Sequence, residues 1–321
     1  MSRSIFLTGA TGFVGKAILG RLVRESYAVI APLRKGSETP VGDIKKINID
    51  TIDGSTEWQG SFADVDVVIH SAARVHVMTD TAVDPLAAFR QINVEGTLNL
   101  ARQAAAGGVR RFIFISSIKV NGEGTSIDTA YSPDDVPAPV DPYGISKKEA
   151  EEALQALAVE TGMEVVIIRP VLVYGPGVKA NFQSMMQWLD KGVPLPFGAI
   201  HNSRSLVAVD NLVDLILVCI RHPAASNQIF LVSDGEDLST TQLLKKMAFA
   251  LDRPPRLLPV PAWTFKFGAA ALGRKDISNR LCGSLRVDIT KTRVLLGWSP
   301  PVSVNEALKV TAQHFRESRI K

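Results

Sequence analysis

The 321-residue chain has only two cysteines, Cys219 and Cys282, and both stand in apolar surroundings. Such low cysteine usage argues against a disulfide framework, so we expect two buried thiols and a reducing compartment. Long hydrophobic runs are also missing, because the most apolar stretch, residues 212–220, is too short to span a bilayer. The first residues lack the apolar core of a signal peptide, and we therefore expect a cytoplasmic protein without a membrane span.

A strong charge imbalance is absent as well, since the formal net charge is +4 at pH 7. Without a clustered basic face, this charge does not indicate nucleic-acid binding, but it suits a small anionic ligand. His70 and His76 have no third ligand at a suitable spacing, so no metal site is expected. We expect both histidines to pack in the fold or to line a crevice.

The first half of the chain alternates apolar runs with amphipathic runs. Strands are expected at residues 4–9, 27–34, 65–73, 110–117 and 163–170, with a weaker strand at 47–52. Helices are expected at residues 14–26, 84–108 and 142–162. This alternation predicts an α/β fold with a doubly wound parallel sheet of the Rossmann type. The continuous apolar runs fit strands that are buried on both faces.

The pattern changes after Pro170. Further strands are expected near 205–209 and 227–234 around a helix at 210–221, and helices dominate from Ser239 onward. We expect a dinucleotide-binding domain at residues 1–170, with returning segments at about 203–235. Residues 171–202 and 236–321 then form a smaller, discontinuous C-terminal lobe, which binds substrate over the carboxyl ends of the strands.

The glycines of "TGATGFVG" lie between the first expected strand and the first expected helix. Gly9 allows a tight turn, Gly12 lets the backbone approach a pyrophosphate, and Gly15 lets helix pack against strand. The backbone N–H groups at the start of the helix then face the pyrophosphate. This context predicts a dinucleotide site.

The end of the second strand lacks the carboxylate that binds the ribose 2′-hydroxyl of NAD. Arg34 and Lys35 stand there instead, in "APLRKGS". Two cations suit a 2′-phosphate, so the sequence favours NADP. The alternative is an exposed basic turn that tolerates NAD.

A tyrosine and a lysine share one face of the helix that begins in "DPYGISK". Asp141 suits the N-cap and Pro142 the first helical position. Tyr143 and Lys147 are four residues apart, and Ser117 ends the preceding strand, where a side chain points into the ligand crevice. We predict that Ser117 holds a carbonyl oxygen, that Tyr143 exchanges its proton, and that the ammonium of Lys147 lowers the pKa of Tyr143.

The motifs "TGATGFVG", "HSAA", "NVEGT", "SSIKVNG", "YGISK" and "RPVLVYGPG" follow one another along essentially the whole chain. With them the sequence resembles the extended short-chain dehydrogenase/reductases, the group of UDP-glucose 4-epimerase. The resemblance implies Ser117, Tyr143 and Lys147 as the catalytic set, supported by Asn93. It also implies a homodimer, formed through the helices that begin near Leu86 and Tyr143.

The resemblance further implies which residues hold the dinucleotide. Besides Arg34, Lys35, Tyr143, Lys147 and Asn93, they are Gly9, Thr11, Gly12, Phe13, Val14, Gly15, Ala72, Ala73, Ser116, Pro170 and Val173.

A UDP-sugar is the substrate that the resemblance implies. Asn181 and Arg204 match positions that hold the UDP diphosphate in relatives, and Arg280 matches a second phosphate contact. Ser117 also contacts the sugar. Lys119 either touches the sugar or is an exposed loop lysine.

The resemblance implies one of three reactions: 4,6-dehydration, 4-epimerisation or 4-keto reduction. A 4,6-dehydratase carries an acidic pair after its catalytic serine or threonine. This chain has Ile118 and Lys119 there, which argues against a dehydratase. The sequence also resembles bacterial polysaccharide-pathway proteins, including those of O-antigen biosynthesis. Together with Arg34 and Lys35, this favours NADP-dependent reduction of a UDP-4-keto-6-deoxy-hexosamine. The alternatives are a UDP-hexose or UDP-N-acetylhexosamine 4-epimerase that uses NAD and, more remotely, a non-enzymatic NADP-binding sensor.

Overall fold

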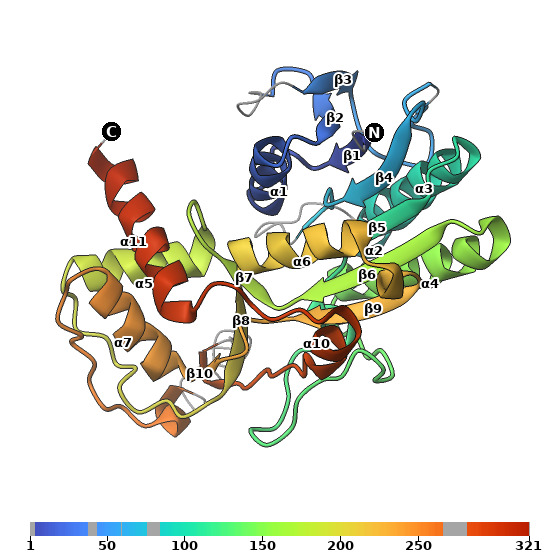
Figure 1. Ribbon diagram of the computed structural model, residues 1–321. Coiled ribbons are helices and arrows are strands. Elements are labelled where there is room, and N and C mark those ends of the chain that lie inside the picture. The colour runs from blue at the N-terminus through green and yellow to red at the C-terminus, as the bar shows by residue number, and fades with distance from the viewer. Residues whose placement is uncertain (1–3, 38–43, 59, 76–83, 266–280, 321) are drawn as a thin grey trace.

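One large parallel sheet organises the chain (Figure 1). The computed structural model describes residues 4–37, 44–58, 60–75, 84–265 and 281–320. In these residues the seven strands follow the order β3-β2-β1-β4-β5-β6-β9. Their bounds are β1 Ser4–Thr8, β2 Ala28–Arg34, β3 Lys45–Ile49, β4 Val65–His70, β5 Arg111–Ile115, β6 Glu164–Pro170 and β9 Gln228–Val232. The order steps outward from β1 in both directions, so the carboxyl ends of β1 and β4 lie at the topological switch point where sheets of this kind bind ligands.

Helices cover both faces of the sheet, which confirms the predicted doubly wound α/β fold. Helices α1 (Phe13–Arg24) and α6 (Val209–Arg221) pack on one face, and α3 (Thr97–Ala106) and α4 (Pro142–Thr161) pack on the other. In β5, Ile113 belongs to the first layer and Phe112 to the second. Successive side chains of a strand point to opposite faces of the sheet, and both faces here are buried. The apolar run in the sequence of β5 is therefore continuous.

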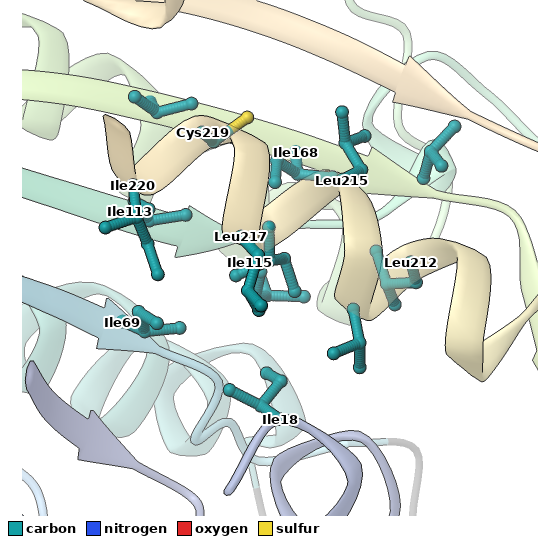
Figure 2. Packing of buried hydrophobic residues seen from close by; sticks show 14 of the residues in the cluster. Ile18, Ile69, Ile113, Ile115, Ile168, Leu212, Leu215, Leu217, Cys219 and Ile220 are labelled. Atoms are coloured by element: carbon teal, nitrogen blue, oxygen red, sulfur yellow. The ribbon is translucent and has the colours of Figure 1, made fainter. Parts of the chain in front are cut away.

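The layer under α6 is aliphatic (Figure 2). Ile113, Ile168 and Leu215 lie in this layer and are fully or almost fully buried. Cys219 lies among them, and burial raises the pKa of its thiol to about 12, as expected of a buried thiol. Cys282 is only partly buried.

The segment 84–108 differs from the single helix that the sequence predicts. It divides into α2 (Pro85–Arg90), a π-helical turn η1 (Gln91–Gly96) and α3. A Cβ at Gly96 would lie 2.7 Å from the carbonyl oxygen of Ile52, so the backbones approach closely there. A π turn adds a residue within a helix and often marks a functional site, and this one contains the buried Asn93.

A second, smaller core lies beyond β6. Strands β7 (Leu172–Tyr174), β8 (Arg204–Ala208) and β10 (Asp237–Leu238) form a three-stranded sheet in the order β10-β8-β7. Helices α5 (Ala180–Asp190), α7 (Thr240–Ala250) and α11 (Val304–Ile320) surround its apolar core, away from the large sheet (Figure 1). Shorter elements are η2 (Ile118–Val120), η3 (Pro223–Ala225) and α10 (Thr290–Leu296).

The returning segments divide between the two cores. Strand β9 pairs with β6 in the large sheet and α6 packs on it, whereas β8 pairs within the small sheet. The domain boundaries proposed from the sequence stay a prediction. In the described part of the chain, no helix is both long and apolar enough to cross a bilayer.

Gly15 fixes how closely α1 packs on the turn after β1. A Cβ at this position would lie 1.9 Å from the carbonyl oxygen of Gly9. We predict that Gly15→Ala lowers the free energy of unfolding by about 1–3 kcal/mol, the usual cost of overpacking. Urea unfolding followed by circular dichroism measures this change.

Gly20 in the same helix is the matched control, because a Cβ there would have no neighbour within 4 Å. Gly20→Ala should leave stability unchanged or raise it by up to about 1 kcal/mol, since alanine is the better helix former. Equal midpoints for the two variants would contradict the close approach.

Candidate functional site

The glycine loop between β1 and α1 forms a cradle of backbone. Gly9 has φ +72°, and its carbonyl oxygen accepts a hydrogen bond from the Gly12 N–H at 2.9 Å. Gly12 is the exposed N-cap residue of α1, and no side chain caps its N-terminal N–H groups. These donors and the helix dipole favour an anion. A dinucleotide pyrophosphate fits here, because among the described residues a Cβ at Gly12 would have only the carbonyl oxygen of Gly9 within 4 Å.

The end of β4 lies against this loop. A Cβ on Gly9 would be 2.7 Å from the N atom of Ala72, and the Ala72 N–H donates to the hydroxyl of Thr8 at 3.3 Å. Ala72 and Ala73 are partly exposed and keep this wall of the loop small. Thr11, Phe13 and Val14 in the loop and the first turn of α1 are also partly exposed. This geometry suits the dinucleotide contacts predicted for all five residues, which stay a prediction.

His70 is a buried packing residue, as one of the two sequence interpretations has it. Its ring nitrogens lie 2.7 Å from the hydroxyl of Thr8 and 2.9 Å from that of Thr97. Burial, with a smaller contribution from the charge of Lys147, lowers the pKa of His70 to about 3. The ring is therefore neutral at physiological pH. His76 lies outside the described residues.

The three predicted catalytic side chains converge at the carboxyl end of β5. Asp141 caps α4 by accepting from the Gly144 N–H at 2.7 Å, and this first turn carries Tyr143. The side chain of Ser117 lies beside the phenol of Tyr143 and opposes the rise of its pKa. One turn later, the ammonium of Lys147 donates to the carbonyl oxygen of Ile115 at 2.7 Å. A proton-transfer group, a hydroxyl and a cation are thus gathered at one edge of the sheet.

The electrostatics of Tyr143 and Lys147 differ from the prediction. Burial, helped by the negative charge of Asp141, raises the pKa of Tyr143 to about 12, while the hydrogen bond to Ser117 opposes this shift. Burial lowers the pKa of Lys147 to about 7, against the charge of Glu151. The expected lowering of the tyrosine pKa by Lys147 is not found, because the ammonium is directed at Ile115 and lies 3.9 Å from the ring centroid of Phe114.

Asn93 ties the first turn of α4 to the loop after β4. Its side-chain amide donates to the hydroxyl of Ser146 and to the carbonyl oxygen of Arg74, each at 3.0 Å. Its oxygen accepts from the Arg74 N–H at 2.8 Å, and Ser146 donates to the carbonyl oxygen of Tyr143 at 2.8 Å. Asn93 therefore holds the backbone that carries Tyr143, which agrees with its predicted supporting role.

A buried ionic network underlies the site, and the sequence did not indicate it. Arg169 on β6 pairs with Glu151 on α4 at 2.6 Å and donates to the side-chain oxygen of Asn121 at 3.0 Å. Ser116 directs its hydroxyl at Glu151, and its contact with the dinucleotide stays a prediction. Burial makes such charges costly unless each is paired and hydrogen-bonded. The network therefore fixes α4 against β5 and β6.

The predicted substrate-binding residues are spread over several elements. Arg204 begins β8 and donates to the carbonyl oxygen of Gly283 at 3.0 Å, and burial lowers the pKa of its guanidinium. Asn181 is exposed in the first turn of α5. Lys119 is paired with Asp141, and with Glu123 at 3.2 Å. Arg280 lies outside the described residues.

Pro170 and Val173, predicted to border the nicotinamide, lie on either side of the β6–β7 junction. Pro170 is the buried last residue of β6, and Val173 is a partly exposed residue of β7. Their contact with the dinucleotide stays a prediction.

The predicted ribose-binding pair lies at the carboxyl end of β2. Arg34 and Lys35 are both exposed. Lys35 lies 3.5 Å from the carboxylate of Asp50, with side chains 77% and 83% exposed. Asp50 follows β3, the strand that pairs with β2 in a register of Arg34 with Ile49. A carboxylate is therefore present at this edge, supplied by the neighbouring strand.

Metal binding has no candidate in the part of the chain that the structure describes, where no group of three or more His, Cys, Asp or Glu side chains could hold an ion.

The Arg169–Glu151 pair leads to a stability prediction. Removing one partner of a buried ion pair leaves the other charge buried without a partner, which typically lowers the free energy of unfolding by about 3–5 kcal/mol. Arg169→Met should therefore lower the free energy of unfolding by about that amount, measured by urea unfolding. Arg90→Met is the control, because Arg90 pairs with Glu149 at the surface and such pairs are worth about 0–1 kcal/mol. Similar losses in both variants would contradict the role of the network.

Comparison with known proteins identifies the relatives of this chain. A UDP-glucose 4-epimerase of Vibrio cholerae is 50% identical over 320 residues, covering 99% of this chain and 97% of that protein. The N-acetyl-alpha-D-glucosaminyl-diphospho-ditrans,octacis-undecaprenol 4-epimerase of Escherichia coli is 27% identical over 334 residues, covering 98% and 96%.

Solved structures agree with the fold. The UDP-glucose 4-epimerase of Thermotoga maritima, crystallised with UDP-glucose, superposes with a TM-score of 0.77 at 26% identity. The match covers 98% of this chain and 99% of that one. Residues 5–233 also match the NAD dependent epimerase/dehydratase family. With the glycine loop, the converging serine, tyrosine and lysine, and a near full-length relative at 50% identity, the chain belongs to this family of extended short-chain dehydrogenase/reductase enzymes.

Proposed function

We propose that this protein is a UDP-hexose 4-epimerase that uses NAD to interconvert UDP-glucose and UDP-galactose. The observation that carries the proposal is the convergence of Ser117, Tyr143 and Lys147 at the carboxyl end of β5. The near full-length similarity to a UDP-glucose 4-epimerase supports the same reaction. Arg34 and Lys35 favour a ketoreductase, the first prediction from the sequence, whereas this similarity favours the alternative.

The reaction removes a proton from the 4-hydroxyl while carbon 4 loses a hydride. NAD held at the glycine loop of Gly9 and Gly12 would supply the acceptor for that hydride and the donor that returns it to the opposite face of the 4-keto sugar. Tyr143 takes the hydroxyl proton as general base and gives it back as general acid. Ser117 holds the same oxygen, since its side chain lies beside the phenol of Tyr143.

Lys147 serves the proton transfer as the cation on the catalytic helix. It is almost fully buried, and its pKa of about 7 shows how costly an unpaired charge is there. Opposite charges stabilise each other most where water is excluded. We propose that an ammonium at Lys147 favours the phenolate that forms at Tyr143 during proton transfer, while burial and Asp141 set the raised pKa of the resting phenol.

NAD is the proposed dinucleotide because the ribose edge is not purely cationic. The carboxylate of Asp50 lies 3.5 Å from the ammonium of Lys35 and weakens its attraction for a 2′-phosphate. An epimerase also restores its nicotinamide within one turnover, so it gains nothing from the NADPH pool. The description of the matching family as NAD dependent supports the same choice.

The proposed diphosphate contact is Arg204. Its guanidinium is partly buried at the start of β8, where burial disfavours the charged form and lowers its pKa. A diphosphate offers charge-assisted, often bidentate hydrogen bonds that offset this penalty. Asn181 assists in the proposal. A homodimer through α2 and α4 stays a prediction from the family resemblance.

The test is a sugar assay with the NAD-loaded protein. With UDP-galactose, UDP-glucose should form without net change in dinucleotide. Tyr143→Phe keeps the ring but removes the proton, so turnover should fall at least about 100-fold, the usual worth of general acid–base catalysis. NAD binding should be nearly unchanged.

Tyr27→Phe is the control variant. Tyr27 packs in the core against the guanidinium of Arg221 and should tolerate loss of its hydroxyl without loss of turnover.

A second assay supplies the protein with a UDP-4-keto-6-deoxy-hexosamine and limiting NADPH. One dinucleotide oxidised per sugar, without epimerisation of UDP-hexoses, would establish the reductase and overturn the proposal. Dinucleotide binding without turnover of any sugar would point to the sensor.

The diphosphate contact is tested with UDP alone. Arg204→Ala should weaken UDP binding about 10- to 100-fold, the usual worth of a charge-assisted hydrogen bond. Isothermal calorimetry measures this affinity. Arg253→Ala is the control, because Arg253 is exposed and pairs only with the surface carboxylate of Asp190 among its described ion pairs. An unchanged UDP affinity in Arg204→Ala would contradict the proposed contact between Arg204 and the diphosphate.

A further inference from the structure

Lys119 lies between two carboxylates beside the catalytic helix. It is the middle residue of the η2 turn, and Ser117 caps that turn by accepting from the Lys119 N–H at 3.2 Å. Its ammonium pairs with Asp141, and lies 3.2 Å from Glu123. The side chains of Lys119 and Asp141 are 33% and 24% exposed, so the pair is partly shielded from water.

Asp141 has two opposing effects on the site. One carboxylate oxygen caps α4 by accepting from the Gly144 N–H, which sets the first turn and the position of Tyr143. The negative charge, two residues from Tyr143, disfavours a phenolate and contributes to the raised pKa of that phenol. The cap therefore helps to position the general base but opposes its ionisation. The second oxygen is the one that Lys119 binds.

We propose that Lys119 is a positioning residue, which neutralises Asp141 and clamps the start of α4 to η2 so that Tyr143 can ionise against Ser117. The proposal rests on the proposed 4-epimerase function. It also chooses between the two roles that the sequence leaves open for Lys119, because an ammonium held by two carboxylates is neither an unattached loop lysine nor directed at a sugar.

Other groups around Tyr143 come from several elements. Lys147 follows one turn later on α4, and its charge contributes to the lowered pKa of the neutral His70 on β4. Phe89 on α2 packs edge-on, with ring centroids 6.0 Å apart, and the guanidinium of Arg74 lies 5.5 Å from the Phe89 ring centroid. Glu123 reaches this region through Lys119. Among these charges, the ammonium of Lys119 binds Asp141 itself, so its removal isolates the effect of that carboxylate.

The experiment measures turnover of UDP-galactose against pH with NAD-loaded Lys119→Met. Removing the cation leaves Asp141 unneutralised, so the phenolate is less favourable and the acid limb of turnover should move to higher pH. We expect a movement of about one pH unit, which lowers turnover about tenfold on the acid side. The KM for UDP-galactose should stay close to its original value.

Matched variants separate this role from a general loss of structure. Lys148→Met removes a similarly exposed α4 lysine whose recorded partner is Glu152, and should leave the pH profile unchanged. Lys119→Arg keeps the charge and should retain the original profile. Lys119→Met combined with Asp141→Asn should return the acid limb towards lower pH, because asparagine still caps the helix without a charge.

A spectroscopic titration makes the proposal independent of the reaction. Tyrosinate absorbance of the NAD-loaded protein is compared with and without Tyr143→Phe, so that the difference reports Tyr143 alone. The midpoint should rise in Lys119→Met and fall again in the double variant. If UDP-hexoses are not epimerised but these midpoints move as expected, the proposed function fails and the positioning role stands.

Two outcomes would overturn the proposal. The first is an unchanged midpoint and pH profile in Lys119→Met. The second is a raised KM for UDP-galactose with an unchanged profile and no rescue by Asp141→Asn, which would make Lys119 a substrate contact.

Discussion

The docking of the start of α4 onto the carboxyl end of β5 is the constraint on which the site depends. The hydrogen bond of 2.7 Å from the ammonium of Lys147 to the carbonyl oxygen of Ile115 joins the two elements directly. One turn earlier, the phenol of Tyr143 lies beside the side chain of Ser117, which follows β5. Because β5 is an interior strand of the sheet and is buried on both faces, its carboxyl end gives the proton-transfer groups a packed base. Asn93 and Asp141 then fix the first turn of α4 from two sides.

Burial has two different effects on the charged groups near the carboxyl end of β5. Below it, the charges of Glu151 and Arg169 are fully paired and hold α4 to β6, so their effect is structural. At the edge itself, burial shifts the pKa of Lys147 down and that of Tyr143 up, and both shifts penalise the charged form. Two neighbouring titratable groups with shifted pKa values are typical of a functional site. The first network fixes the position of α4 and so holds Tyr143 and Lys147 in place, although burial penalises their charged forms.

The sequence predicts the parts that depend on local pattern. The strands, the glycine positions and the Asp141–Pro142 helix start follow from runs and spacings within a few residues. The π turn at residues 91–96 was missed because its side chains continue the helical pattern of residues 84–108. Strand β7 and helix α5 were also missed, since glycines and prolines near them indicate loops.

Contacts between distant segments could not be predicted. The carboxylate of Asp50 comes to Lys35 only through the register of β2 with β3. The Arg169–Glu151 and Lys119–Asp141 pairs join residues 18 and 22 positions apart on different elements. The predicted lowering of the Tyr143 pKa was wrong because burial, which no spacing reveals, raises this pKa, and because the ammonium of Lys147 is directed at Ile115.

An isotope experiment tests the central claim most directly. UDP-galactose that carries deuterium at carbon 4 is converted by the NAD-loaded protein in the presence of excess unlabelled NADH. An epimerase removes the label and returns it within one turnover, so the UDP-glucose product should retain deuterium at carbon 4 and the free dinucleotide should remain unlabelled. Transfer of deuterium to the free dinucleotide, with unlabelled sugar as product, would contradict a 4-epimerase and indicate a dehydrogenase or reductase that exchanges its cofactor.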